Sequence, residues 1–347
     1  QELLLGIGGL NALLALGHDP VVCHMNEGHA AFISLARLSH LCSDMGYYID
    51  TSLEIVRRSN VFTTHTPIAA GNESFEGQLL ERHIQPLGNE LGIDPSLVLD
   101  WGRPDGSEPG SEYSMTILGL RMADFVNGVS ELHGRVARRM WMHLWPDRPE
   151  DEIPIRHITN GAHMDTWLSP DNSALFDRHL GPEWRDDPGS ETGLDAIDAM
   201  PEDELWRIHE RGRTRLVRTA RELVESQYLA RNAAKEERLQ LRSVLDYDCL
   251  TVGFARRFAT YKRAGLLLRD KERLEALLNN KERPVQIIFS GKAHPADQPG
   301  KELIKELFVF ARQANERKRI VFLENYNMFV ARHLVHGVDV WLNTPRR

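Results

Sequence analysis

The chain has 347 residues, of which 41% are hydrophobic, and a formal net charge of −8, so it can bury a sizeable core and is expected to form two domains. An acidic chain without a recurring basic stripe is not typical of a nucleic-acid-binding protein. Its longest apolar runs have the length of strands, far short of the roughly 20 residues that cross a bilayer, so no membrane span is expected.

Three widely spaced cysteines give neither a disulfide framework nor a paired metal motif, and we therefore expect a cytoplasmic protein. The chain starts at Gln1 without an initiator Met or a signal peptide, and it stops at Arg347 just after an apolar run. This pattern indicates a piece of a longer protein.

In the first part of the chain, short apolar segments alternate with helical stretches. Strands are predicted at residues 20–25, 60–65, 125–130 and 155–160. Residues 1–17 predict a glycine-bearing helix packed closely on a neighbour. The pair Gly6-x-Gly8 matches the start of a dinucleotide-binding fingerprint, but no strand precedes it and Asn11 stands where the third glycine belongs.

The second part is more regular. Residues 202–245 have helix-forming composition and predict one or two long connecting helices. Strands follow at residues 249–254, 285–290, 320–323 and 338–342, separated by charged helical segments. This βαβ alternation over residues 247–343 requires a parallel sheet with right-handed crossovers, and the fold class is therefore α/β.

Polar residues stand at the carboxyl end of each predicted strand, where open parallel sheets bind their ligands. These residues are Asn26, His29, His65, Asn127 and Asn160 in the first part, and Arg256, Arg257, Ser290, Lys292, Tyr326, Asn343 and Thr344 in the second. Each has a structural explanation when taken alone, since Asn-Gly is a turn and Asn or Ser caps helices. Their common position at strand ends favours a functional edge in each part.

The stretch GFARRFATYKRAG concentrates four cations, Arg256, Arg257, Lys262 and Arg263, directly after a strand. If a helix begins near Lys262, its N-terminus already carries partial positive charge, so cations there are unfavourable unless an anion offsets them. Guanidinium forks, a lysine and free backbone N–H groups suit phosphate. The alternative is a solvated basic face that pairs with some of the 50 acidic residues.

No metal site is expected. His24 and His29 flank Glu27, but HMNEGH is not the H-E-x-x-H zinc motif and lies at a strand end. His333 and His336 are three residues apart on a predicted helix without a third ligand nearby, and we expect them at the surface.

Eight motifs in order resemble those of the α-glucan (glycogen and maltodextrin) phosphorylases, in particular the shorter bacterial and archaeal type. They are HMNEGHAAF, VFTTHTPIAAGNESF, YSMTILGLRMADFVNGVSELHG, ITNGAHMDTW, VGFARRFATYKRAGLLL, IIFSGKAHPAD, VFLENYNM and GVDVWLNTPRR. The resemblance implies the B-type glycosyltransferase (GT-B) fold of two Rossmann-like lobes, incomplete at both ends in this chain. Residues 1–158 would be the second half of the N-terminal lobe, and residues 159–347 the first part of the C-terminal lobe.

The resemblance also implies an activity, a cofactor and partners. The family reversibly cleaves α-1,4-glucan with inorganic phosphate to glucose 1-phosphate with retention of configuration. It uses pyridoxal 5′-phosphate linked to a lysine, and the full-length proteins are commonly homodimers. By position, Arg257 would bind the substrate phosphate, Arg256 would lie near the cofactor phosphate, and Lys262 would lie between the two.

Further residues are assigned by the same resemblance. His65 would contact the sugar at the reacting centre, where its backbone carbonyl can face the developing oxocarbenium ion. Asn160 would contact a glucose hydroxyl, Asn26 and His29 would line the same wall, and Tyr326 would lie close to the cofactor.

The chain departs from the family pattern in three ways. Asn327 stands where animal enzymes have an arginine that reaches the cofactor phosphate, and Arg256 stands where the family often has lysine. The motif that carries the cofactor lysine would follow NTPRR, so Lys292, Lys301 and Lys305 are not assigned to the Schiff base.

Two alternatives to a phosphorylase remain open at this point. One is a non-catalytic glucan- or phosphate-binding remnant. The other is a nucleotide-sugar glucan synthase of the same architecture, against which HTPIAAGNESF and VFLENYNM argue.

Overall fold

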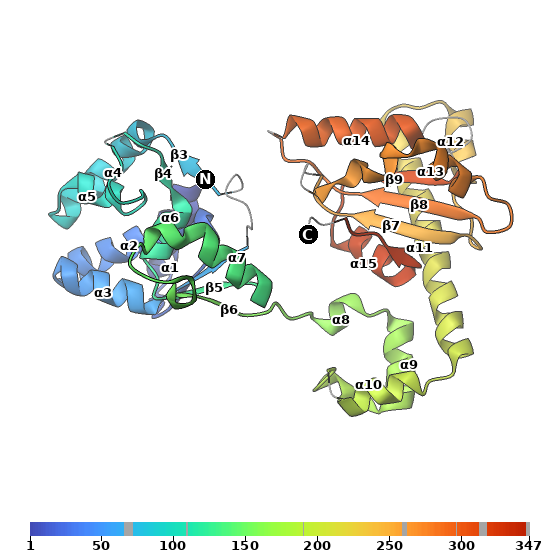
Figure 1. Cartoon of the computed structure of the whole chain (residues 1–347), viewed down its shortest axis with the longest axis horizontal. Helices are drawn as coiled ribbons and strands as arrows, with labels where there is room; N and C mark the ends of the chain where they lie inside the picture. Colours follow the sequence, from blue (N-terminus) through green and yellow to red (C-terminus); the bar gives the residue numbers. More distant parts are fainter. Residues whose placement is uncertain are drawn as a thin grey trace. The chain divides into compact units, whose positions relative to one another are not determined.

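The computed structural model describes residues 1–65, 72–108, 110–189, 191–258, 262–295, 297–311 and 318–344. The chain forms two compact units, Gln1–Gly161 and Ala162–Arg347, and each contains its own four-stranded sheet (Figure 1). Parallel sheets with intervening helices confirm the predicted α/β class. The first unit ends at Gly161, so Asn160 belongs to it.

The sheet of the first unit has the strand order β1-β2-β5-β6, and all neighbours are parallel. Its strands are β1 (Cys23–Asn26), β2 (Asn60–Thr64), β5 (Phe125–Gly128) and β6 (Ile155–His157). The first strand begins three residues later than predicted, because the register pairs Cys23 with Asn60, the first residue of β2, and nothing pairs with the residues before it.

Helices precede and connect these strands. They are η1 (Leu4–Gly8), α1 (Gly9–Ala15), η2 (Gly28–Ala30), α2 (Ile33–Ser39), η3 (His40–Asp44), α3 (Ile49–Ser59), α4 (Gly77–Leu91), α5 (Pro95–Asp100), α6 (Met115–Arg121), α7 (Glu131–Trp141), η5 (Met142–Leu144) and η6 (Glu150–Glu152). Two short strands, β3 (Ser74–Phe75) and β4 (Tyr113–Ser114), pair antiparallel.

The core of the first unit is one large cluster, to which all four strands contribute. Met25, Phe62, Val126 and Ile155 are each almost fully buried in it. The close packing predicted for the N-terminal glycines is confirmed, since a Cβ on Gly6 would lie 2.8 Å from the Cβ of Phe32.

The second unit begins with helices and continues as the predicted βαβ series. The helices are α8 (Met164–Trp167), α9 (Pro170–Leu180), η7 (Pro182–Arg185), α10 (Glu191–Asp198), α11 (Glu202–Ala230), α12 (Lys235–Leu241), η9 (Ala264–Arg269), α13 (Lys271–Leu278), α14 (Gln298–Ala311) and α15 (Met328–Gly337). The strands are β7 (Leu250–Ala255), β8 (Val285–Ser290), β9 (Ile320–Leu323) and β10 (Val340–Trp341). They are parallel, in the order β10-β7-β8-β9.

This second sheet is covered on both faces. Ile288 of β8 packs in a cluster with residues of α11 and α15. Its neighbours Ile287 and Phe289 pack in another cluster with residues of η9, α13 and α14. Alternate side chains of one strand thus enter separate cores, which explains why the strands are unbroken apolar runs.

The structure refines two expectations for the second unit. A helical segment does begin near Lys262, but it is a six-residue 3-10 helix, Ala264–Arg269, rather than an α-helix. His333 and His336 are half-buried instead of being at the surface. The His333 ring packs 4.3 Å from the Phe329 ring, centroid to centroid.

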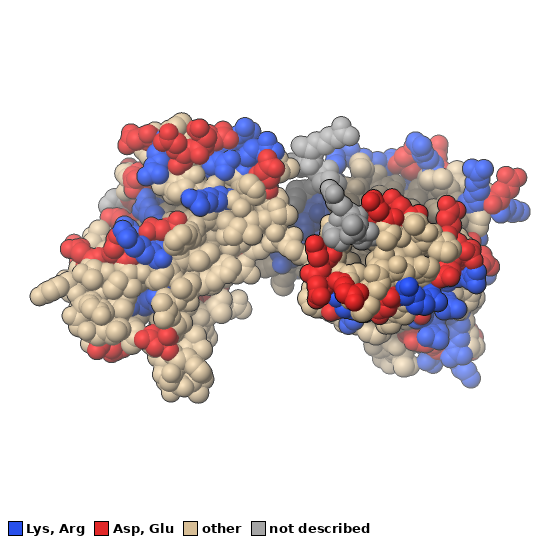
Figure 2. All heavy atoms as spheres, turned by 90° about the horizontal axis from the view of Figure 1, so that it is seen from below, with Lys and Arg blue, Asp and Glu red and all other residues tan. Residues whose placement is uncertain are grey.

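The face in Figure 2 carries acidic and basic side chains side by side. Among the described residues, no helix has the length and apolar content that a membrane span requires.

Candidate functional site

The predicted sugar-binding residues of the first unit gather at the carboxyl edge of its sheet. Asn26 is the last residue of β1, and His65 directly follows the last residue of β2. Asn160 follows β6, and its backbone N–H donates to the Val129 carbonyl at 3.1 Å. Because β1, β2, β5 and β6 are parallel neighbours, these positions share one edge of the sheet.

His65 is held by the two residues at the end of β1. Its Nε2 bonds to Asn26 Oδ1, and its backbone N–H donates to the Glu27 carboxylate. With a carbonyl oxygen as the acceptor, Nε2 carries the proton, and Nδ1 of the neutral ring is left as an acceptor. Such a ring can accept a hydrogen bond from a sugar hydroxyl. Thr66 and Pro67, the next residues of the motif, lie outside the described residues.

His29 lies on η2, directly beyond β1, and pairs with a carboxylate distant in sequence. Its Nδ1 is 3.0 Å from Glu73 Oε2. The other histidine of the motif, His24, is engaged elsewhere, with Nε2 2.8 Å from Thr63 Oγ1. The two histidines therefore do not share a ligand, and no group of three metal-ligating side chains occurs among the described residues.

In the second unit, Arg256 and Arg257 follow the carboxyl end of β7, as predicted. Arg256 is half-buried, and its Nη1 donates to Asn343 Oδ1 in the segment after β10. The next residue, Thr344, donates from Oγ1 to the Lys262 carbonyl at 2.7 Å. Asn343 and Thr344, which follow β10, thus bind the basic segment at two points, Arg256 and Lys262.

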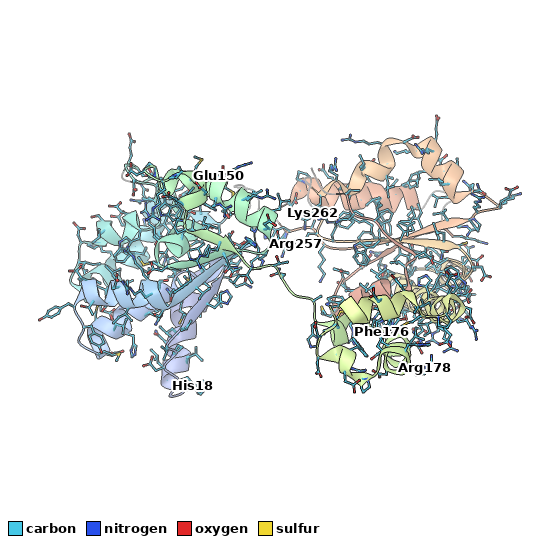
Figure 3. All side chains as sticks on the ribbon, turned by 60° about the horizontal axis from the view of Figure 1, so that its bottom comes forward. His18, Glu150, Phe176, Arg178, Arg257 and Lys262 are labelled. Carbon is cyan, nitrogen blue, oxygen red and sulfur yellow. The ribbon has the colours of Figure 1, made fainter. Side chains whose placement is uncertain are left out.

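Lys262 lies in a strongly electropositive environment. Burial, followed by the charges of Arg256 and Arg257, lowers its pKa below the ordinary value. Figure 3 labels Lys262 and Arg257 on this unit. Arg257 is exposed, and within the described part of the chain it forms no ion pair. Positive charges that lower the pKa of Lys262 favour binding of an anion, which offsets their repulsion.

Tyr326 lies on the same edge of the sheet, but two strands away from Arg256, because β8 separates β7 from β9. Its ring is half-buried against the cluster formed with α11 and α15, and this burial raises its pKa. The neighbouring Asn327 caps α15, since its Oδ1 accepts from Val330 N at 3.0 Å. The residue that departs from the family pattern therefore has a structural role here.

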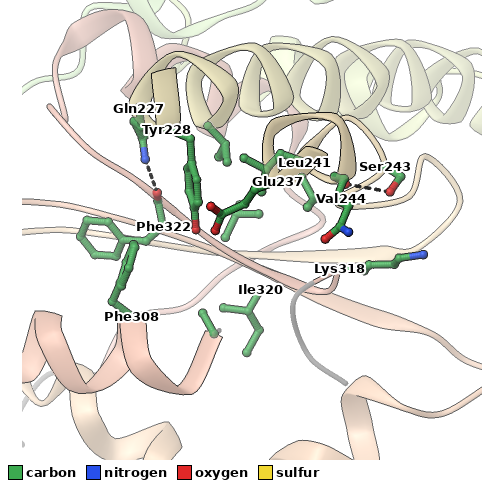
Figure 4. Close-up of a pocket in the computed structure, with 14 residues that line it drawn as sticks. Gln227, Tyr228, Glu237, Leu241, Ser243, Val244, Phe308, Lys318, Ile320 and Phe322 are labelled. Carbon is green, nitrogen blue, oxygen red and sulfur yellow. Dashed lines mark hydrogen bonds between the residues drawn. The ribbon is translucent and has the colours of Figure 1, made fainter. Parts of the chain in front are cut away.

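A cavity of about 590 Å³ lies elsewhere in the second unit, beside β9 (Figure 4). Its walls include Tyr228 of α11, Leu241 of α12, Phe308 of α14 and Phe322 of β9. Gln227 donates to the Phe322 carbonyl at its rim, at 3.0 Å. No predicted site residue lines this cavity.

Sequence reasoning did not predict the contacts of four residues that hold the site residues in place. Glu27 and Glu73 contact His65 and His29, and Asn343 and Thr344 fasten the basic segment. Glu27 lies in HMNEGH, the sequence that was compared with the zinc motif, and Asn343 and Thr344 stand at the end of a predicted strand. Glu73 stood in the motif VFTTHTPIAAGNESF, but its contact with His29 arises only through the fold.

Comparison with known proteins agrees with the sequence resemblance. A family model described as carbohydrate phosphorylase matches residues 107–342. The match covers more than half of the chain, which therefore belongs to the carbohydrate phosphorylase family.

Individual relatives extend the match to the whole chain. A maltodextrin phosphorylase of Thermococcus litoralis is 42% identical over 350 residues, covering 100% of this chain and 40% of the relative. A glycogen phosphorylase of Mycobacterium tuberculosis is 42% identical over 355 residues, covering 100% and 41%. One of Aquifex aeolicus is 37% identical over 345 residues, covering 99% and 49%. The chain thus spans less than half the length of these relatives.

Proposed function

We propose that this chain is part of an α-1,4-glucan phosphorylase, a glycosyltransferase that cleaves glycogen, starch or maltodextrin with phosphate to give glucose 1-phosphate with retention. The observation that carries the proposal is the 42% identity to a maltodextrin phosphorylase over the whole chain. The two compact units would then be parts of the two Rossmann-like lobes of the GT-B fold.

The second unit supplies the phosphate-binding half of this proposal. Arg257 is exposed and can form a bidentate contact with the substrate phosphate. Lys262, with its lowered pKa, contributes a charge that becomes more favourable once a phosphate dianion is bound. Together these groups stabilise negative charge on the phosphate that attacks or leaves the sugar.

The first unit supplies the sugar-binding half. His65 would present its free Nδ1 to a sugar hydroxyl, because Asn26 occupies Nε2. Asn26, His29 and Asn160 would add contacts to the glucan from the same sheet edge. A histidine oriented by Asn26, together with fixed amides, suits recognition of hydroxyl groups, which both donate and accept.

The family implies pyridoxal 5′-phosphate, and the residues present fit the phosphate end of that group. Arg256 and Lys262 are cations at one strand end, and the pKa of Lys262 is lowered by burial and then by the charges of Arg256 and Arg257. Tyr326 would lie near the cofactor, although it stands two strands from Arg256. When bound, this cofactor supplies a phosphate that exchanges a proton with the substrate phosphate.

Phosphorolysis by the natural whole protein tests the proposal. Maltodextrin incubated with inorganic phosphate is expected to release glucose 1-phosphate, and proton NMR of the product should show the α-anomer. Release of free glucose in place of the phosphate ester would make the protein a hydrolase. Tight glucan binding without any product would favour the non-catalytic binding remnant.

A further inference from the structure

The geometry points to Glu27 as a positioning residue for His65. Its carboxylate accepts a hydrogen bond from the His65 backbone N–H. This contact fixes the backbone where the chain leaves β2, and the backbone in turn fixes the position of the His65 imidazole. The inference rests on the proposed function in that His65 is taken to contact the sugar.

The backbone of Glu27 is the first observation. Its φ is 69° and its ψ is 173°, a left-handed conformation that favours glycine. In the described part of the chain, non-glycine residues with positive φ are Glu27, Asn232, Leu245, Arg263 and Asn325. Such a conformation is strained for a non-glycine residue and persists only where the surrounding structure holds it.

The contacts of Glu27 are the second observation. Its own N–H donates to the Thr63 carbonyl at 2.9 Å, which ties its backbone to β2. Its carboxylate then reaches past the end of β2 to accept from the His65 N–H. One residue thus links the end of β1 to β2 twice, on either side of Thr64.

The ring of His65 completes the arrangement. Asn26, which directly precedes Glu27, accepts from His65 Nε2. Glu27 thus holds the backbone of His65, and Asn26 holds its imidazole. If the carboxylate were lost, the backbone N–H would lose its partner and the Asn26 contact alone would not fix the direction of Nδ1.

The test compares two substitutions of Glu27 in the natural whole protein. Glu27→Gln keeps an oxygen acceptor at the same reach, and we expect turnover within about threefold of the parent. Glu27→Gly removes the acceptor but suits the left-handed backbone, so the protein should fold, while kcat falls roughly 10- to 100-fold. The KM for phosphate should not change in either variant. Asn232→Gly, at another residue with positive φ (54°), is the matched control and should leave kcat unaltered.

A second readout separates this inference from the proposed function. The NMR signals of the His65 ring, assigned from their loss in His65→Gln, should move in Glu27→Gly and stay close to the parent in Glu27→Gln. If His65→Ala abolishes turnover but Glu27→Gly is fully active, the positioning role is wrong and the function stands. If the protein has no phosphorylase activity, the function is wrong, and the ring signals alone decide: unchanged signals in Glu27→Gly overturn the inference.

Discussion

At the residue scale, Arg257 can be removed with little structural consequence. It is exposed, and within the described residues it makes no ion pair that the protein would lose. If it binds the substrate phosphate, Arg257→Ala should raise the KM for phosphate roughly 10- to 100-fold, because a charged hydrogen bond contributes about 1.5–3 kcal/mol. The KM for glucan should change little.

Phosphate-saturation curves of the natural protein measure this effect. Arg273→Ala, which removes another exposed arginine of the second unit, is the control and should match the parent. An unaltered KM for phosphate in Arg257→Ala removes Arg257 from the phosphate site.

A second prediction at the residue scale concerns the protonation of Lys262. Its pKa in the folded protein is lowered by burial and by Arg256 and Arg257. The unfolded chain therefore binds more protons between the lowered and the ordinary pKa, and stability attributable to this group rises with pH across that window. A bound phosphate favours the charged lysine and raises its pKa.

The protein should therefore take up protons when it binds phosphate at alkaline pH. Calorimetric titration of the whole protein with phosphate, in two buffers of different ionisation enthalpy, measures the number of protons taken up. We expect less uptake in Lys262→Met. Equal uptake in both proteins would mean that Lys262 does not sense the anion.

The residue scale also shows what sequence could predict. The cations at 256, 257 and 262 were found because they directly follow a strand, a local pattern. The carboxylates that hold the two histidines were not found as partners, because Glu73 and His29 lie far apart in sequence and meet only through the fold. The helix expected near Lys262 begins at Ala264, after Arg263 in a left-handed conformation (φ 51°), and it is a short 3-10 helix.

At the scale of elements, Asp339 joins α11 to the sheet. His209 Nε2 lies 2.6 Å and Arg213 Nη1 2.8 Å from Asp339 Oδ1, and the Thr251 N–H donates to Oδ2 at 2.6 Å. Burial raises the Asp339 pKa, but these hydrogen bonds and charges outweigh it, and the pKa lies below the ordinary value. The associated stability is present above the unfolded pKa and is lost as pH falls through the folded pKa.

Asp339→Ala should therefore destabilise the second unit by about 3–5 kcal/mol, because it leaves Arg213 buried without its partner. Urea unfolding followed between neutral and acidic pH measures this. The difference from the parent should shrink at acidic pH, and a difference independent of pH would contradict the assignment to the ionised carboxylate.

The crossing of α11 and α15 gives another prediction at this scale. A Cβ on Gly212 would collide with the backbone oxygen of His336, and a Cβ on Gly337 would lie 2.6 Å from the Gly212 oxygen. Gly212→Ala should destabilise by about 1–3 kcal/mol, despite alanine's better helix propensity.

Thermal unfolding compares Gly212→Ala with Gly9→Ala, whose added Cβ meets nothing within 4 Å. Gly9→Ala should be neutral or stabilising by up to about 1 kcal/mol. Equal effects of the two substitutions would mean that α11 and α15 do not pack this closely.

The first and last residues of a strand were predicted correctly from sequence where the strand is buried on both faces. Strands β8 and β9 begin and end at the predicted residues, because their apolar runs coincide with the covered part of the sheet. The last strand, predicted at residues 338–342, has only Val340–Trp341 in the sheet. Here Asp339, whose carboxylate accepts from the Thr251 N–H, lies directly before the paired residues of β10. The hydrophobic periodicity of the sequence does not reveal this contact.

At the scale of the whole molecule, the α/β class and the division into two units followed from the alternation of strands and helices. Membership of the carbohydrate phosphorylase family followed from linked motifs and agrees with the family match over residues 107–342. The pairing of His65 with Glu27 depends on the parallel register of β1 and β2, which places their ends side by side. Sequence periodicity predicts such strands but not the side-chain contacts at their ends.

The most direct test of the central claim is the intact mass of the natural protein before and after borohydride reduction, which fixes a pyridoxal Schiff base on its lysine. A mass well above the 39.6 kDa of this chain, with a pyridoxyl adduct after reduction, is the result that a pyridoxal-phosphate-dependent phosphorylase predicts. A mass near 39.6 kDa without an adduct would contradict it and leave a protein that binds glucan or phosphate without the catalyst.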